Sequence, residues 1–208
     1  ASDVYKRQPV RIVRNAETNL GDLCADAYRA LSNADIAFVN GGGIRKQIEA
    51  GDITLDDIYS VHPFGNTMCV IRVTGQQVLD ALEWGARAVP SENGSFLQVS
   101  GLTYEIHTGV ASSAEKDENG MFTRVSGEYR VKNVMVGGQP LELDKTYTLA
   151  SHNYMLLGHG DGYTMFDGCE VLGEDMMVDN QVLITYITTT LGGVVGEQYA
   201  LSLIHISE

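Results

Sequence analysis

The segment most informative about the fold is DIAFVNGGGIR, residues 35–45. Its first half is a short, mostly apolar run ending at Asn40, which is typical of a strand buried on both faces. Three glycines centred on Gly42 follow at once, and glycine lets the backbone approach a ligand closely. Arg45 then supplies a forked cation that can bind phosphate through two hydrogen bonds. The pattern indicates a binding site at the end of a buried strand.

An ordinary tight turn is the alternative interpretation of these glycines. The stretch lacks the Lys-Ser/Thr ending of a phosphate-binding P-loop, and it lacks the glycine spacing of a dinucleotide fingerprint. The sequence therefore supports neither ATP-loop nor Rossmann chemistry.

Helix-like and strand-like units alternate around this stretch as far as about residue 89. Apolar spacing predicts an amphipathic helix from Leu20 to Leu31, whose first turn Thr18 or Asn19 can cap. Further units are a strand at residues 11–13, a helical turn at 54–58, a strand at 68–74 and a helix at 75–89.

Beyond Pro90 the apolar residues alternate with period two, and turns rich in glycine or charge separate the runs. Strands are predicted at residues 102–106, 122–125, 129–135 and 146–151, with a hairpin loop at 114–120. A closing helix is predicted at 181–191, although its three consecutive threonines are weak helix formers. We predict a mixed α/β (α+β) fold of layered sheets with flanking helices, in one domain covering residues 9–200.

The composition narrows the function. The 208 residues hold 14 basic and 27 acidic side chains, a net charge of −13, which argues against binding to a nucleic-acid backbone. Hydrophobic residues make up 44%, as in a folded globule, yet no run reaches the roughly 20 apolar residues of a membrane span. The three cysteines are far apart and show no zinc-binding spacing. We expect neither a membrane span nor a metal site here.

The two ends look foreign to the rest of the chain. Residues 2–8 and 201–208 resemble translated sequencing-adapter strings, so we interpret residues 1–8 and 201–208 as non-native tails on a fragment. The alternative is an N-terminal strand and a short C-terminal β-type run, which the apolar alternation at residues 203–206 would permit.

Two later segments carry further candidate residues. In HPFGN, residues 62–66, proline and glycine favour a loop from which Phe64 can project as a stacking platform, although a lone phenylalanine is more often part of a core. The segment 151–163 follows a predicted strand and places Tyr154 and Asp161 among histidines and glycines. A carboxylate beside flexible backbone suits recognition of hydroxyl groups. No nucleophile stands in an elbow context, so we predict no catalytic residue.

Four motifs in this order resemble the C-terminal domain of the 5′-nucleotidase family. They are RNAETNLGDL (residues 14–23), NGGGIR (40–45), HPFGN (62–66) and NY-x6-DGY (153–163). In that family this domain holds the nucleoside. A separate N-terminal metallophosphatase domain carries two divalent metal ions and hydrolyses the phosphate ester.

The resemblance implies a role for each matching residue. Phe64 and Tyr154 are similar to the two aromatics that sandwich the base, although the second is phenylalanine in many members. Asp161 is similar to the aspartate that binds the ribose hydroxyls, and Asn40 to the asparagine at the base edge. The segment between Tyr154 and Asp161 is one residue longer than in some relatives.

The resemblance also implies that the nucleoside site is positively charged. Arg14 and Arg45 are similar to the pair near ribose and phosphate, and the glycine loop around Gly42 lies between them in the chain. They would form a local positive patch inside an acidic protein.

The chain shows no dimetal signature, so we expect it to bind a nucleoside or nucleotide without hydrolysing it, with the metals and catalysis in a partner domain. The alternatives are a stand-alone nucleotide-binding module and a family cousin that acts on a non-nucleotide anion. The resemblance also implies a location outside the cytoplasm.

Overall fold

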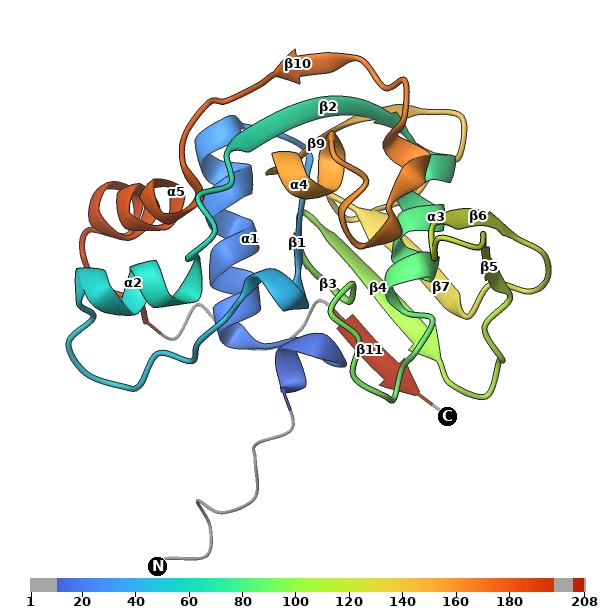
Figure 1. Ribbon diagram of the computed structural model, residues 1–208, viewed down its shortest axis with the longest axis horizontal. Helices are drawn as coiled ribbons and strands as arrows, with labels where there is room; N and C mark the ends of the chain where they lie inside the picture. Colours follow the sequence, from blue (N-terminus) through green and yellow to red (C-terminus); the bar gives the residue numbers. More distant parts are fainter. Residues whose placement is uncertain (1–10, 197–203, 208) are drawn as a thin grey trace, which may run out of the picture.

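The computed structural model describes residues 11–196 and 204–207. A central sheet with strand order β10-β2-β9-β1-β3 runs through the molecule (Figure 1). Its strands are β1 (Ile36–Asn40), β2 (Met68–Thr74), β3 (Leu97–Ser100), β9 (Thr146–His152) and β10 (Val171–Gly173). β1 is parallel to β9 and antiparallel to β3, whereas β2 pairs antiparallel with β9 along its whole length.

A second sheet has the order β11-β4-β7-β8, and a separate hairpin is formed by β5 and β6. These strands are β4 (Leu102–His107), β5 (Ala114–Lys116), β6 (Phe122–Val125), β7 (Val131–Val136), β8 (Gln139–Pro140) and β11 (Ile204–Ser207). β11 lies parallel to β4, so the C-terminal string contains the β-type run that was the alternative interpretation.

Helices flank both faces of the central sheet (Figure 1). They are α1 (Asn19–Ser32), α2 (Leu55–Val61), α3 (Gly75–Gly85), α4 (Asn153–Leu156) and α5 (Asp179–Thr185), which continues as a π-helical turn at Tyr186–Thr190. Four 3-10 turns complete the described elements, at Ile12–Arg14, Gly41–Gly43, Gly160–Gly162 and Thr164–Phe166. The predicted class, layered sheets with flanking helices, is confirmed.

Successive side chains of β1 point to opposite faces of the sheet, and both faces are covered. Ile36 and Phe38 pack into a cluster shared with α3 and the second sheet, while Ala37 and Val39 pack into a cluster shared with α1 and α5. All five residues of the strand are buried. A strand covered on both faces needs a continuous apolar run, and that is the pattern from which it was predicted.

The predicted helix at residues 20–31 is present as α1, and the structure selects Thr18 as its cap. The Thr18 hydroxyl accepts a hydrogen bond from the amide of Gly21 at 2.9 Å. Leu23, Cys24 and Ala27 are buried on one face of the helix, as the spacing of three and four residues required.

Several elements differ from the prediction. Residues 11–13 do not form a strand, because the amides of Arg14 and Asn15 bond to carbonyl groups three residues earlier and close a 3-10 turn. α3 ends at Gly85 rather than near residue 89, and the closing helix changes to a π-helical turn at its threonines. β3 was not predicted, although it pairs with β1 at the edge of the central sheet.

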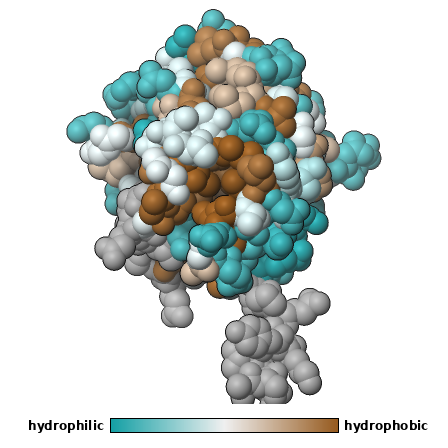
Figure 2. All heavy atoms as spheres, turned by 90° about the vertical axis from the view of Figure 1, so that its left-hand side faces the viewer, coloured by the Kyte–Doolittle hydropathy of each residue, from teal (hydrophilic) through white to brown (hydrophobic). Residues whose placement is uncertain are grey.

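Figure 2 shows the left-hand side of Figure 1, the face that carries α2 and α5, with a group of apolar side chains at its centre. Leu55 and Tyr59 of α2 are among the exposed apolar residues of the molecule. Among the described residues, no helix combines the length and the apolar character needed to cross a bilayer.

Candidate functional site

The glycine turn after β1 packs against the N-terminal segment. A Cβ at Gly41 would lie 2.2 Å from the carbonyl oxygen of Val13, so only glycine allows this approach. The amide of Gly42 donates to the carbonyl of Gly94 at 2.8 Å. The backbone that approaches Gly41 closely is therefore that of Val13 and not that of a ligand. This contact brings Arg14 to the end of β1.

The loop after β9 is held equally tightly. Asp161 has a positive φ of 57°, and its carbonyl accepts a hydrogen bond from Trp84 Nε1 at 2.9 Å. A Cβ at Gly160 would meet the ring of Tyr154 at 2.5 Å, so this glycine lets the ring lie against the loop. The geometry of Asp161 and Tyr154 is thus set by packed backbone.

These two loops and the segment around Phe64 enclose a cavity of about 440 Å³. All seven residues predicted for the binding site line it: Arg14, Asn40, Gly42, Arg45, Phe64, Tyr154 and Asp161. These residues are far apart in the sequence, from position 14 to position 161. The fold brings the predicted site residues together, and their contact with a ligand remains a prediction.

A chain of hydrogen bonds runs through the floor of the cavity. The amide of Met155 donates to His152 Nδ1 at 3.3 Å, so the proton of this imidazole sits on Nε2. His152 Nε2 then donates to Asn40 Oδ1 at 2.8 Å, and Asn40 Nδ2 donates to Asp161 Oδ2 at 2.6 Å. Burial lowers the pKa of His152 to about 4, which keeps the ring neutral at pH 7.

The carboxylate of Asp161 has a second protein donor. The Tyr154 hydroxyl donates to Asp161 Oδ1 at 3.1 Å. Partial burial and the adjacent negative charge of Asp161 raise the pKa of Tyr154, so the phenol keeps its proton. Each oxygen of Asp161 therefore accepts one hydrogen bond within the protein.

Both aromatic residues project from the surface. Phe64 is 59% exposed and Tyr154 is 45% exposed, so the alternative that Phe64 belongs to the core is wrong. The guanidinium carbon of Arg45 lies 5.6 Å from the centre of the Phe64 ring, within the range of a cation–π contact. Two accessible ring faces on one cavity can receive a flat, apolar group.

The cavity is locally cationic. Burial, followed by the charges of Arg11 and Arg45, lowers the pKa of Arg14, but a guanidinium group stays charged in proteins. Arg45 donates to the carbonyl of Gly42 at 3.3 Å. Among the described residues the guanidinium group of Arg14 makes no hydrogen bond, which leaves its donors available for an anion.

Sequence reasoning assigned no role to four other lining residues: Gly43, Asn66, Gly94 and His152. Asn66 stands two positions after Phe64, and reciprocal hydrogen bonds with Asp179 hold its backbone. His152 ends a buried strand, a signal that could have identified it. His62, in contrast, is buried and bonds the Gly43 carbonyl at 3.2 Å, so its role is structural.

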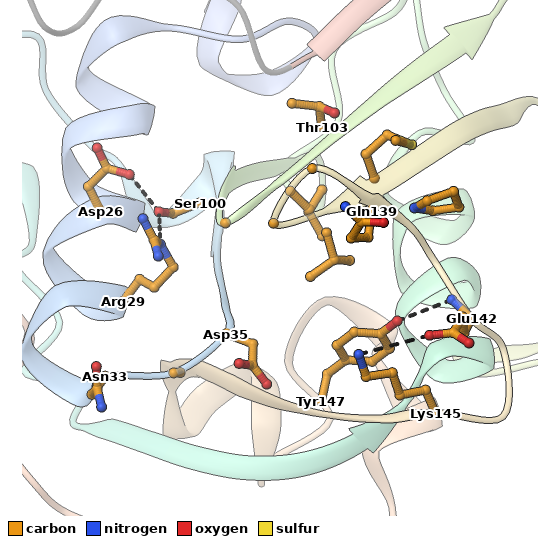
Figure 3. A pocket seen from close by; sticks show the side chains of 18 of the residues that line it. Asp26, Arg29, Asn33, Asp35, Ser100, Thr103, Gln139, Glu142, Lys145 and Tyr147 are labelled. Atoms are coloured by element: carbon orange, nitrogen blue, oxygen red, sulfur yellow. Dashed lines mark hydrogen bonds and ion pairs between the residues drawn. The ribbon is translucent and has the colours of Figure 1, made fainter.

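A larger cleft of about 900 Å³ lies beside α1 and the β7–β8 hairpin (Figure 3). Its walls carry charges of both signs, including Asp26, Arg29, Asp35 and Lys145, and several of these are already paired within the protein. None of the predicted site residues lines it. We therefore place the candidate site in the smaller cavity.

The implied pair of metal ions does not fit the part of the chain that the structure describes. No group of three or more histidine, cysteine, aspartate or glutamate side chains there could hold a metal ion. His159, for example, pairs with Asp167, and no third side chain of these types joins them among the described residues. The residues of the cavity are suited to binding and orienting a ligand.

Comparisons with known proteins agree with this fold. The family model described as "5′-nucleotidase, C-terminal domain" matches residues 2–168. A 5′-nucleotidase of Vibrio cholerae is 34% identical over 85% of this chain, and a trifunctional nucleotide phosphoesterase protein of Bacillus subtilis is 38% identical over 79%. The chain spans 28% of the first relative's length and 11% of the second's.

A solved structure shows the same arrangement. The crystal structure of a 5′-nucleotidase precursor from Thermus thermophilus superposes with a TM-score of 0.79 at 32% identity. The match covers 95% of this chain and 37% of the Thermus chain.

Proposed function

Because the chain belongs to the 5′-nucleotidase C-terminal domain family, we propose that it is the nucleoside- or nucleotide-binding part of a metal-dependent 5′-nucleotidase. Such an enzyme hydrolyses the phosphate ester of nucleotides. The observation that carries the proposal is the cavity in which two exposed aromatic rings, Phe64 and Tyr154, face the same space as a carboxylate and two guanidinium groups.

Each part of the cavity matches one part of a nucleotide. A base stacks on aromatic faces whatever its identity, with about 1–3 kcal/mol per base. Asp161 offers free acceptor lone pairs to the sugar hydroxyls, and Arg14 and Arg45 offer donors to a phosphate. The buried amide of Asn40 positions Asp161, and the second donor of that amide remains for the base edge that we predicted.

The chemistry of hydrolysis is proposed to lie in a partner metallophosphatase domain outside this chain. When bound there, two divalent ions would supply the activated water and neutralise the developing charge on phosphate. The residues of this chain hold the nucleoside so that its phosphate reaches that centre. Both a separate domain and a location outside the cytoplasm rest on membership of the family.

Calorimetry on the complete 208-residue chain tests the proposal. We expect measurable binding of adenosine and AMP that persists after chelation of metal, since stacking and the Asp161 and arginine contacts use none. With Mn²⁺, Zn²⁺ or Mg²⁺ the chain should release no phosphate from AMP. Addition of a separately expressed metallophosphatase domain should restore hydrolysis. Absence of nucleoside binding would refute the nucleotide-binding function, and metal-dependent turnover by the chain alone would refute the division of labour.

The stand-alone module and the anion-binding cousin are separated by the same measurements. A module without catalysis would bind nucleosides but gain no activity from any metallophosphatase partner. A cousin that acts on a non-nucleotide anion would bind phosphate or sulfate without a base. The exposure of Phe64 and Tyr154 favours the nucleotide, because a simple anion has no flat apolar group that could stack on two aromatic faces.

Replacing Phe64 by alanine should weaken adenosine binding by about 1–3 kcal/mol, through loss of one stacking face. The melting temperature should stay the same, because the ring is 59% exposed and contributes little to the core. Calorimetry and a thermal melt check the two parts separately. Tyr59→Ala, on the exposed face of α2, is the matched control, and its adenosine affinity should equal that of the parent. Unfolding of Phe64→Ala would contradict an exposed stacking role.

A further inference from the structure

Packing positions Tyr154 and Asp161 next to each other. The Asp161 backbone is fixed by the indole of Trp84, and the Tyr154 ring packs on Gly160 without space for a Cβ. The hydrogen bond between the Tyr154 hydroxyl and Asp161 Oδ1, 3.1 Å long, is thus a feature of the packed loop. The phenol occupies this oxygen before any ligand arrives.

The two hydrogen bonds that Asp161 accepts differ in how easily a ligand can displace them. Asn40 is 3% exposed and is held by His152 on its other side, so a ligand displaces its bond to Oδ2 less easily. Tyr154 is 45% exposed and lines the cavity. A hydroxyl-bearing ligand therefore competes with the phenol at Oδ1, and with water alone at the remaining lone pairs.

Competition of this kind reduces what a ligand hydroxyl contributes. A ligand that donates to Oδ1 must share a charge-assisted hydrogen bond or replace it, so the net gain is smaller than at a carboxylate bonded only to water. The base, which stacks on the ring face of Tyr154, does not depend on the phenol oxygen. The hydroxyl thus acts on the sugar and leaves the base unaffected.

We propose that the Tyr154 hydroxyl is a specificity-determining group that lowers the preference for ribose over 2′-deoxyribose, so that 2′-deoxyribonucleosides belong to the ligand class of this site. This inference rests on the proposed nucleoside-binding function. Within the loop between Tyr154 and Asp161, His159 also has a left-handed backbone, with a φ of 56°.

The test compares adenosine with 2′-deoxyadenosine by calorimetry on the complete chain. Tyr154→Phe keeps the stacking ring and removes the competing donor, so the ratio of riboside to deoxyriboside affinity should rise at least threefold above that of the parent. Tyr59→Phe, which removes an exposed phenol away from the cavity, should leave the ratio unchanged. Asp161→Asn should bring the ratio close to one, because the carboxylate is the group for which sugar and phenol compete.

The possible results are distinct. A ratio that stays the same or falls in Tyr154→Phe overturns the inference while nucleoside binding itself stands. Loss of all nucleoside binding in Tyr154→Phe also overturns it, because phenylalanine should stack as well as tyrosine. If the parent chain binds neither nucleoside, the proposed function fails and the inference falls with it.

Discussion

Replacing Arg130 by methionine is expected to lower the free energy of unfolding by about 3–5 kcal/mol, because it leaves several buried carbonyl groups without a hydrogen-bond donor. Arg130 is 5% exposed, and its guanidinium group donates to the carbonyls of Val89 and Ala86 at 2.8 and 3.0 Å and to Val110 at 3.0 Å. These bonds tie the segment after α3 to the loop after β4.

The buried carboxylate of Glu83 adds to this cost. Glu83 is fully buried, and its two oxygens accept hydrogen bonds from the amides of Arg130 and Val131 at 3.0 and 2.9 Å. Burial raises the pKa of Glu83, while the amides and the charge of Arg130 act in the opposite direction. Without that cation, the carboxylate keeps its two amide hydrogen bonds but loses the favourable interaction with the positive charge of Arg130.

Urea unfolding monitored by circular dichroism measures the loss. Arg124→Met is the matched control, because Arg124 pairs with Glu115 on the exposed β5–β6 hairpin and should leave stability almost unchanged. Equal midpoints for the two variants would show that Arg130 is not a structural anchor. The same region joins α3 to β7, because Glu83 of α3 accepts hydrogen bonds from the amides of Arg130 and Val131 at the start of β7.

The sequence could predict those elements whose apolar residues recur at the spacing of a strand or a helix. The apolar run of β1 and the amphipathic α1 follow from the spacing of apolar residues and a capping threonine. β3 was missed because its four residues, LQVS, are too few to show a period, and its identity as a strand comes from pairing with β1. Residues 11–13 look apolar enough for a strand, but no neighbouring strand offers them a partner among the described residues.

The same distinction applies to the site. Phe64, Tyr154 and Asp161 could be singled out because loops rich in proline and glycine rarely need such side chains. Their assembly with Arg14 depends on the approach of the Val13 carbonyl to Gly41, a long-range packing feature that spacing does not reveal. The tautomer of His152 could not be predicted, since it follows from a contact with the amide of Met155 that appears only in three dimensions.

The second large effect expected is on phosphate recognition. Replacing Arg14 by glutamine should weaken AMP binding by about 1.5–3 kcal/mol, or roughly 10- to 100-fold, while adenosine binding stays close to that of the parent. The guanidinium group of Arg14 lines the cavity and makes no hydrogen bond among the described residues, so its donors face the ligand. A hydrogen bond to a charged group contributes more than a neutral one, and adenosine carries no charge to receive it.

The neighbouring Arg11 provides a matched control for this variant. Arg11 carries the same charge but is paired with Glu92 at 3.5 Å and does not line the cavity, so Arg11→Gln should leave the ratio of AMP to adenosine affinity nearly unchanged. Calorimetry at 50 and 300 mM salt adds a second readout, since screening weakens the charge-dependent part of AMP binding and leaves adenosine binding unaffected. If Arg14→Gln weakens both ligands equally, Arg14 supports the cavity wall. If Arg11→Gln matches it, AMP responds only to the summed charge of this segment. Only a selective loss of AMP affinity in Arg14→Gln identifies a direct phosphate contact.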